Sequence, residues 1–345
     1  MMYNDIVGYC MREGIFVVLA ALLTAGLFSC RGKEEAEKEM TLVMAEVNPA
    51  ETIAGQMDYA FKRKVEELSG GKIKIDLQCS GILGDVDSVM ALMLKPGSTI
   101  QIHRMSAVNM ATYGCKDSSL LGIPYTFSSK EHFWNFALSD TGQKILDEPV
   151  ENGLGVKGLF YGEEGFRNFF STAKIEKVQD FKGLKVRGTG DDAMQGMILA
   201  FGAESVPVNY ADLYAKLQTG AISVAEQPIA NYLANHFYEA APYMILDGHT
   251  LGVMETVITL EAWNSLSEKQ KNVLLEAGKY ASGFCRELSA KEEDRVKAEL
   301  KKAGVAITDV ADIAPWQNAC SKVIEESSAV NPKLYKNILA YADKK

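Results

Sequence analysis

The sequence predicts an α/β protein whose two lobes close on a ligand, and three observations support this. The chain has 345 residues, enough for two domains, and its 47% hydrophobic and 23% charged residues are typical of a globular protein. Strand and helix patterns alternate in residues 41–106 and again in residues 153–227. A helical pattern over residues 265–304 is long enough to lie across both lobes and tie them together.

The first series reads strand, helix, strand, helix, strand. Residues 41–47 form an apolar strand, and residues 54–71 an amphipathic helix that ends at two glycines. Residues 72–78 ("KIKIDLQ") alternate as a strand does, residues 84–97 form a helix stopped by Pro-Gly, and residues 98–106 form a third strand. This β-α-β-α-β unit predicts parallel strands with crossover helices.

The second series is again α/β and covers about 85 residues. Residues 153–171 read as strand, turn and strand, where adjacent Glu163 and Glu164 before a glycine predict a solvated turn. In the helical tail that follows, Ser267 and Gln270 have the spacing of a capping box. The remaining predicted elements alternate as strand, helix, strand, helix and strand: 178–188, 191–202, 203–208, 210–220 and 221–227.

The N-terminus has the architecture of a bacterial lipoprotein signal. The apolar run of residues 15–28 is too short for a stable membrane anchor, and "LFSC" resembles a processing site that makes Cys30 the lipidated first residue. We therefore expect a signal peptide at 1–29 and a charged tether at 30–40; an ordinary secretory signal is the alternative. Either Met1 or Met11 can be the initiator. The predicted location is periplasmic, with the protein attached to a membrane through its lipid.

The composition and motifs exclude several functions. A net charge of −9 argues against a nucleic-acid partner, and there is no GxSxG, HExxH, Walker or EF-hand pattern, so we expect no enzymatic activity, no cofactor and no metal. Export permits disulfides, but spacing does not reveal a pairing, and for Cys285 and Cys320 buried free thiols on apolar helix faces fit equally well. Beyond Cys30 the cysteines are Cys79, Cys115, Cys285 and Cys320.

Two arginines and an amide are candidate ligand contacts. Arg187 ends the predicted strand "GLKVRG", and ligands of α/β sheets bind beyond the carboxyl ends of strands. Its planar guanidinium suits a carboxylate. Arg167 lies among aromatic residues, and Gln227 ends another strand of the same lobe, before a proline that fixes the turn. For either arginine alone, a surface salt bridge is the alternative.

The segment "FRNFFST…VQDFKGLKVRG" followed by "FGAESVPVNYADLYAKLQTGAISVAEQP" resembles the DctP-type substrate-binding proteins of TRAP transporters. The family pattern runs G-x-R-x-x-T, D-x-K-G-L-K-x-R, G-A-x-P-x-P and E-x-Y-x-A-L-Q-x-G-x-x-D-G-x-E-N-P. Supporting matches are "GILGD", "GIPYTF" and "HFYEAAPYMILDGHT", so that the likeness covers about residues 41 to 310.

The resemblance implies a two-lobe periplasmic-binding-protein fold, type II-like, with a hinge and a long helix spanning both lobes. Lobe I would comprise 41–163 plus about 253–292, and lobe II 164–252 plus about 293–345. Such a protein delivers a small organic acid to a TRAP membrane permease. By the same resemblance Arg187 pairs with the ligand carboxylate, Arg167 is a second contact, Gln227 stands at the E-N-P asparagine, and Tyr210 is the aromatic residue before E-x-Y.

The chain departs from the family pattern at the ligand seat. "SVAEQP" replaces D-G-x-E-N-P, with Gln227 one methylene longer than asparagine, and residues 103–105 are His-Arg-Met where small residues or a glutamate are usual. Glu46 on the first strand is predicted to face the cleft and to repel an acid nearby. A sialic acid or C4-dicarboxylate ligand is therefore doubtful. The alternatives are a more apolar ligand handled with an accessory periplasmic TPR protein, a sensory binding protein or, less favoured, an exported enzyme.

Overall fold

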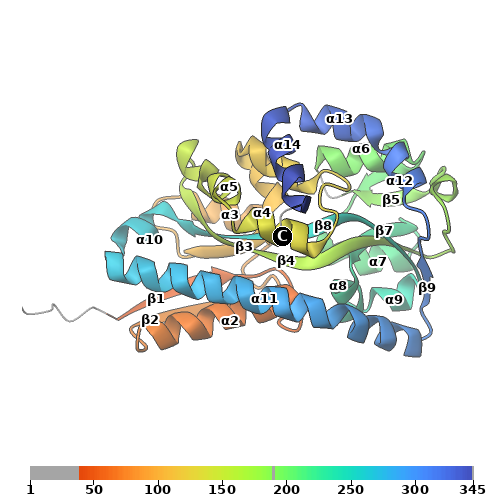
Figure 1. The fold of residues 1–345 in the computed structure, drawn as a ribbon. Helices are drawn as coiled ribbons and strands as arrows, with labels where there is room; N and C mark the ends of the chain where they lie inside the picture. Colours follow the sequence, from red (N-terminus) through yellow and green to blue (C-terminus); the bar gives the residue numbers. More distant parts are fainter. Residues whose placement is uncertain (1–38, 189–190, 344–345) are drawn as a thin grey trace, which may run out of the picture. The chain divides into compact units, whose positions relative to one another are not determined.

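The computed structural model describes residues 39–188 and 191–343, in which nine strands form one mixed sheet (Figure 1). The strand order is β2-β1-β3-β8-β4-β7-β5-β6, and β9 pairs with β8 outside this path. The strands are β1 (Met40–Ala45), β2 (Ile73–Gln78), β3 (Ile102–Ser106), β4 (Val156–Ser171), β5 (Lys185–Gly188), β6 (Glu204–Pro207), β7 (Val224–Pro228), β8 (Tyr243–Thr259) and β9 (Ala306–Asp309).

Two parallel sets of strands are joined by two long antiparallel ones. β1 pairs in parallel with β2 and β3, and β5 pairs in parallel with β6 and β7, as the two predicted β-α-β series require. Between the sets lie β4 and β8, of 16 and 17 residues. β3 pairs with residues 254–258 of β8, whereas β7 pairs with residues 167–171 of β4. The sheet therefore passes from one parallel set to the other through the middle of β4 and β8.

The structure corrects the prediction for residues 153–171. They do not form a strand, a turn and a strand, because β4 runs on from Val156 to Ser171 with register shifts against β8, one of them between Glu163 and Phe166. The predicted solvated turn at Glu163 and Glu164 is wrong: the two residues are 0% and 6% exposed. A shift of register changes the direction of a strand without ending it, so the glycine here marks a bulge.

The helices cover the faces of the sheet and begin at recognisable caps. Asp191 caps the helix α6, and the predicted capping box of Ser267 and Gln270 is present at the start of α11. The α-helices are α2 (Ile53–Leu68), α3 (Val86–Met93), α4 (Lys130–Ala137), α5 (Asp140–Glu151), α6 (Asp192–Ala200), α7 (Leu213–Gln218), α8 (Ile229–Ala234), α9 (Phe237–Ala240), α10 (Leu260–Ser265), α11 (Glu268–Lys302), α12 (Ala314–Ala319), α13 (Ser321–Ser328) and α14 (Pro332–Leu339). Short 3-10 helices are η1 (Ala107–Tyr113), η2 (Lys116–Gly122), η3 (Val178–Phe181), η4 (Tyr210–Asp212) and η5 (Ala340–Asp343).

The long helix α11 packs on elements of both parallel sets. It has 35 residues and contacts α2, which links β1 to β2, as well as β4 and α8, which follows β7 (Figure 1). A Cβ on Gly278 would lie 2.6 Å from Cδ1 of Phe160, so only glycine permits this approach of α11 to β4. The helix therefore spans both sets, as predicted. Its buried face contains Leu274, Ala281 and Cys285, whereas Tyr280 is 46% exposed.

Residues from Met40 onward make up one compact unit. The predicted signal peptide and residues 30–38 of the predicted tether lie outside the described residues, and Met40, predicted as the last tether residue, is the first residue of β1. Cys79, Cys115, Cys285 and Cys320 are free thiols, and all but Cys79 are buried. In the described part of the chain, no helix is both long and apolar enough to cross a membrane.

Candidate functional site

A cavity of about 190 Å³ lies where the carboxyl ends of the two parallel sets meet. Its lining includes residues that end or follow β1, β3, β5 and β7, which is where ligands bind in α/β sheets. The cavity is smaller than the ~300–1,000 Å³ of pockets for drug-sized molecules, so it suits a small solute. The polar side chains that line it come from both sets: Asn48, Arg104, Ser106, Asn109, Glu164, Arg167, Arg187, Asp191, Tyr210, Gln227, Asn231 and Thr250.

Arg187 is a buried guanidinium without a close carboxylate. It lies near the end of β5, is 7% exposed, and donates from Nε to the carbonyl oxygen of Val208 at 3.1 Å. Among the described residues its nearest carboxylate oxygen is Oε1 of Glu226, 4.0 Å from Nη1. Burial and the charge of Arg167 lower the pKa of Arg187, although Glu226 acts in the opposite direction. A ligand carboxylate here would therefore meet a cation that the protein leaves incompletely neutralised.

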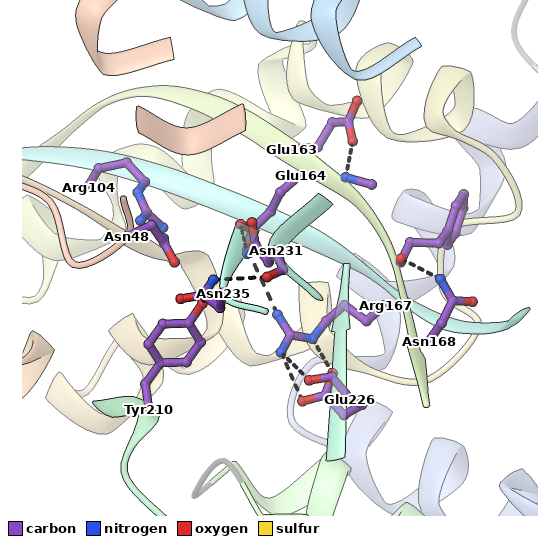
Figure 2. A network of polar contacts seen from close by, with 12 residues as sticks. Asn48, Arg104, Glu163, Glu164, Arg167, Asn168, Tyr210, Glu226, Asn231 and Asn235 are labelled. Atoms are coloured by element: carbon purple, nitrogen blue, oxygen red, sulfur yellow. Dashed lines mark hydrogen bonds and ion pairs between the residues drawn. The ribbon is translucent and has the colours of Figure 1, made fainter. Parts of the chain in front are cut away.

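Arg167, in contrast, is held by the protein itself. Its Nε and Nη2 both donate to the carboxylate of Glu226 on β7, and Nη1 lies 3.8 Å from Oε1 of Glu164 (Figure 2). Glu226 is 0% exposed; burial alone would raise the pKa of its carboxyl, but Arg167 and His249 lower it to about 2. This two-pronged contact fixes the direction of Arg167.

A buried histidine completes the charge network behind the cavity. His249 on β8 lies with Nδ1 2.7 Å from Oδ2 of Asp247 and Nε2 3.5 Å from Oε2 of Glu226. Burial disfavours the imidazolium, but the two carboxylates outweigh it and raise the pKa of His249 to about 9. The ring of Phe169 packs against it at a tilt of 31°, with centroids 4.4 Å apart. His249 is therefore charged at neutral pH and places a second positive charge, besides that of Arg167, near Oε2 of Glu226.

A second buried pair supports the other wall of the cavity. Arg104 on β3 donates from Nε and Nη2 to both carboxylate oxygens of Glu46, which also accepts from the backbone N–H and side-chain amide of Asn48. Burial opposes ionisation of Glu46, but Arg104 and these hydrogen bonds lower its pKa. Burial and then the charge of Glu46 raise the pKa of neighbouring Asp58 well above its usual value, which disfavours its charged form. Arg104 thus lines the cavity with its charge already balanced.

Glu164 and Asn231 meet between the two arginine walls. Asn231 on α8 donates from Nδ2 to Oε2 of Glu164 at 2.8 Å, and Tyr210 accepts at its hydroxyl from Nδ2 of Asn235, also at 2.8 Å (Figure 2). The amide oxygen of Asn231, a residue that is 1% exposed, has no hydrogen-bonding donor in the part of the chain described. Glu163 points away from this group and accepts from the backbone N–H of Gly165 (Figure 2).

Four of the five ligand contacts predicted from the sequence line this cavity. Arg187, Arg167, Gln227 and Tyr210 come together there, and no side-chain hydrogen bond joins Gln227 to another described residue. The fifth, Glu46, is not in the lining, because its carboxylate turns to Arg104, and this pairing removes the repulsion predicted for a nearby acid.

The sequence reasoning did not identify Arg104, Glu164 and Asn231 as parts of the site. The unusual "HRM" on β3 was the available signal for Arg104. The prediction of a turn at Glu163 and Glu164 hid the role of Glu164. Asn231 lies three residues after the strand-ending proline, and no sequence signal indicated its role.

The arrangement supports binding rather than catalysis. Within the described residues, no group of three or more His, Cys, Asp and Glu side chains could hold a metal ion. Glu46, Glu164 and Glu226 are engaged with arginines, an asparagine or a histidine, and Asp191 accepts from the backbone N–H of Met194. Arg187 is left as a site for a small anion.

Comparisons with known proteins agree with this arrangement. A solute-binding protein of Sulfitobacter sp. (strain NAS-14.1) is 30% identical over 244 residues, 71% of this chain and 73% of that protein. The C4-dicarboxylate-binding periplasmic protein DctP of Shewanella loihica is 27% identical over 311 residues, 88% of each. The crystal structure of a TRAP periplasmic solute-binding protein from Pseudomonas putida F1, with bound D-glucuronate, has a TM-score of 0.82 at 24% identity, covering 87% of this chain and 96% of that one.

The structural similarity confirms the predicted two-lobe α/β fold. The sequence model of the bacterial extracellular solute-binding proteins, family 7 (DctP), matches residues 44–330, which is most of the chain. This is a family of binding proteins and not of enzymes, in agreement with the prediction. The chain belongs to the family 7, or DctP, bacterial extracellular solute-binding proteins.

Proposed function

We propose that this protein binds a small organic acid in the cavity, with its carboxylate on Arg187, and delivers it to a TRAP-type membrane permease. The observation that carries the proposal is the buried Arg187 guanidinium, whose nearest carboxylate in the described part of the chain is 4.0 Å away. Gln227 and Tyr210, which line the same cavity, provide an amide and a hydroxyl beside it.

The relatives support an acid as the ligand class. The Shewanella loihica protein is named for C4-dicarboxylates, and the Pseudomonas putida structure holds D-glucuronate. These ligands differ in size and in charge but share a carboxylate. A carboxylate is also the group that a planar guanidinium binds with two parallel hydrogen bonds.

Replacing Arg187 tests the proposal. Mass spectrometry of the small molecules released on denaturing the purified protein identifies the acid, and calorimetry then measures its affinity for wild type and Arg187→Ala. A charge-assisted contact of about 1.5–3 kcal/mol predicts a loss of about tenfold or more. Arg295→Ala, an exposed change on α11, is the matched control and should bind as wild type does. An unchanged affinity in Arg187→Ala would remove this residue from the ligand site.

Attachment and partners follow from the sequence. We propose that Cys30, which lies outside the described residues, carries a lipid that holds the protein at the periplasmic face of a membrane, near the permease. Incorporation of labelled fatty acid by wild type but not by Cys30→Ala would test this. An accessory TPR protein stays a prediction, which co-purification would test.

A further inference from the structure

The guanidinium groups of the cavity are not equivalent. Arg104 donates to both carboxylate oxygens of Glu46, and Arg167 donates to both of Glu226. Of the three arginines that line the cavity, only Arg187 has no such bidentate partner among the described residues. The cavity therefore has one binding position for a ligand carboxylate, at Arg187. To reach Arg104 or Arg167, a second carboxylate of the ligand would have to displace a buried protein carboxylate.

The wall formed by Glu164 and Asn231 is rich in hydrogen-bond acceptors. Both residues line the cavity, and the amide oxygen of Asn231 has no donor from the described residues. The Asn231 amide nitrogen donates one of its two hydrogens to Glu164. The wall therefore offers a ligand a carboxylate and an amide oxygen as acceptors, beside one remaining amide N–H. Hydrogen-bond donors of a ligand bind to such a wall, whereas the charge of Glu164 repels a ligand carboxylate.

Hydroxyl groups fit this wall better than an ammonium group. Arg167 lies 3.8 Å from Glu164, and the charge of Glu164 also acts on Arg104, so this carboxylate already has cationic neighbours. In and behind the cavity, the cations Arg104, Arg167, Arg187 and His249 face the carboxylates Glu46, Glu164, Glu226 and Asp247. A fifth carboxylate, Asp191, also lines the cavity and caps the N-terminus of α6. A hydroxyl satisfies the acceptors without adding a positive charge to the three arginines.

The rest of the lining suits the carbon chain of such a ligand. Apolar side chains that come from α3, the end of β3, η1 and β8 share the cavity with the polar groups: Val86, Met105, Val108, Leu251 and Val253. An apolar surface can pack against the C–H groups of a hydroxylated chain while its hydroxyls meet Glu164 and Asn231.

We propose that the ligand is a monocarboxylic acid bearing hydroxyl groups, and that Glu164 is the residue that rejects dicarboxylates. The carboxylate sits on Arg187, and the hydroxyls donate to Glu164 and to the amide oxygen of Asn231. This inference rests on the proposed function, because it takes the carboxylate seat at Arg187 as given.

Calorimetry on the wild-type protein measures the predicted selectivity with defined probes. D-galactonate, D-gluconate and D-erythronate are hydroxylated monoacids, succinate is a dicarboxylate, hexanoate lacks hydroxyls and 4-aminobutyrate carries an ammonium group. At least one hydroxylated monoacid should bind about tenfold or more tightly than succinate, hexanoate and 4-aminobutyrate, the loss expected for a missing hydrogen bond to a charged group. Equal binding of hexanoate, or preference for succinate or 4-aminobutyrate, overturns the inference.

Glu164→Gln isolates the role of the charge, and Glu163→Gln is its matched control. In Glu164→Gln the preference for the best hydroxylated monoacid over succinate should fall by about tenfold or more, because the like charge is gone. Glu163 is the neighbouring buried glutamate outside the cavity lining, so Glu163→Gln should keep the wild-type preference. If Glu164→Gln does not fold, the same selectivity measurement is made on Glu164→Asn, which also removes the charge.

The outcomes separate this inference from the proposed function. If Arg187→Ala loses the acid while Glu164→Gln keeps the wild-type preference, the inference fails and the proposed function stands. If none of the acids in the panel binds, or if Arg187→Ala binds them as wild type does, the carboxylate seat itself is wrong and both fail.

Discussion

Buried ion pairs hold the arginines of the cavity in fixed directions. Glu46 engages Arg104 with both oxygens, and the two side chains are 0% and 3% exposed. Removing one partner of a buried pair leaves the other charge uncompensated, which is far more costly than losing a surface pair. Glu46 therefore contributes to the site by orienting Arg104, although it does not line the cavity.

Glu46→Gln should lower the free energy of unfolding by about 3–5 kcal/mol, because Arg104 then lacks its carboxylate. Urea denaturation measures this value. The matched control is Glu299→Gln, which removes a partner of Arg295 from a pair whose side chains are 53% and 56% exposed. It should cost about 1 kcal/mol or less. Equal costs for the two variants would show that the buried pair is not a determinant of stability.

His249 should make stability depend on pH in the alkaline range. Its pKa is raised from 6.5 in the unfolded chain to about 9 in the folded protein. The stabilisation is therefore complete below pH 6.5 and is lost as pH rises through about 9, a change of up to about 3 kcal/mol. Chemical denaturation of wild type and His249→Asn between pH 6 and 10 measures it. The difference between the two proteins should shrink as pH rises, and a constant difference would contradict the prediction.

The cavity residues that sequence reasoning found were marked by a strand end or by a motif position. Arg187 and Gln227 end buried strands, and Arg167 and Tyr210 stand in motif positions, so pattern and topology placed them together. Arg104 was noticed only as an unusual residue. Arg104 pairs with Glu46, 58 residues away along the chain, and Arg167 pairs with Glu226, 59 residues away. No local sequence pattern shows such pairings.

At the scale of elements, the sequence predicted the alternation of strands and helices and missed the length of β4. A glycine after two glutamates is typical of a solvated turn, but Gly165 lies at a bulge inside a continuous strand, with φ +87°. The burial of Glu164 depends on contacts with α8, which is more than 60 residues away in sequence. The local pattern therefore could not separate a turn from a bulge.

The contact of α11 with β4 depends on Gly278. A Cβ there would lie 2.6 Å from Cδ1 and 3.1 Å from Cγ of Phe160, a buried ring, so Gly278→Ala should destabilise the fold by about 1–3 kcal/mol through overpacking. Gly283→Ala, on the same helix, meets no atom within 4 Å and should stabilise by up to about 1 kcal/mol. Thermal and urea unfolding compare the two variants. Opposite signs are expected, and equal stability would mean that Phe160 moves aside freely.

At the scale of the whole molecule, three elements link the two parallel sets around the cavity. β4 and β8 pass between the sets, and α11 packs on α2 from one set and on α8 from the other. The register of β4 against β8 shifts between Glu163 and Phe166, beside the cavity, where Glu164 and Arg167 project. An interrupted ladder bends more easily than a regular one, so we place the hinge of lobes I and II at this bulge.

Ligand binding should therefore make the protein more compact. Residues of both sets line the cavity, and a ligand held by Arg187 on one side and by the Glu164 wall on the other favours the closed form in proportion to the extra contacts it makes there. Small-angle X-ray scattering should show a smaller radius of gyration when the identified acid is added at saturation to ligand-free protein. Arg187→Ala under the same conditions should keep the ligand-free value, since it loses the carboxylate contact. A wild-type protein that binds the acid by calorimetry without any change in scattering would show that binding and closure are not coupled, and would move the hinge away from the bulge in β4.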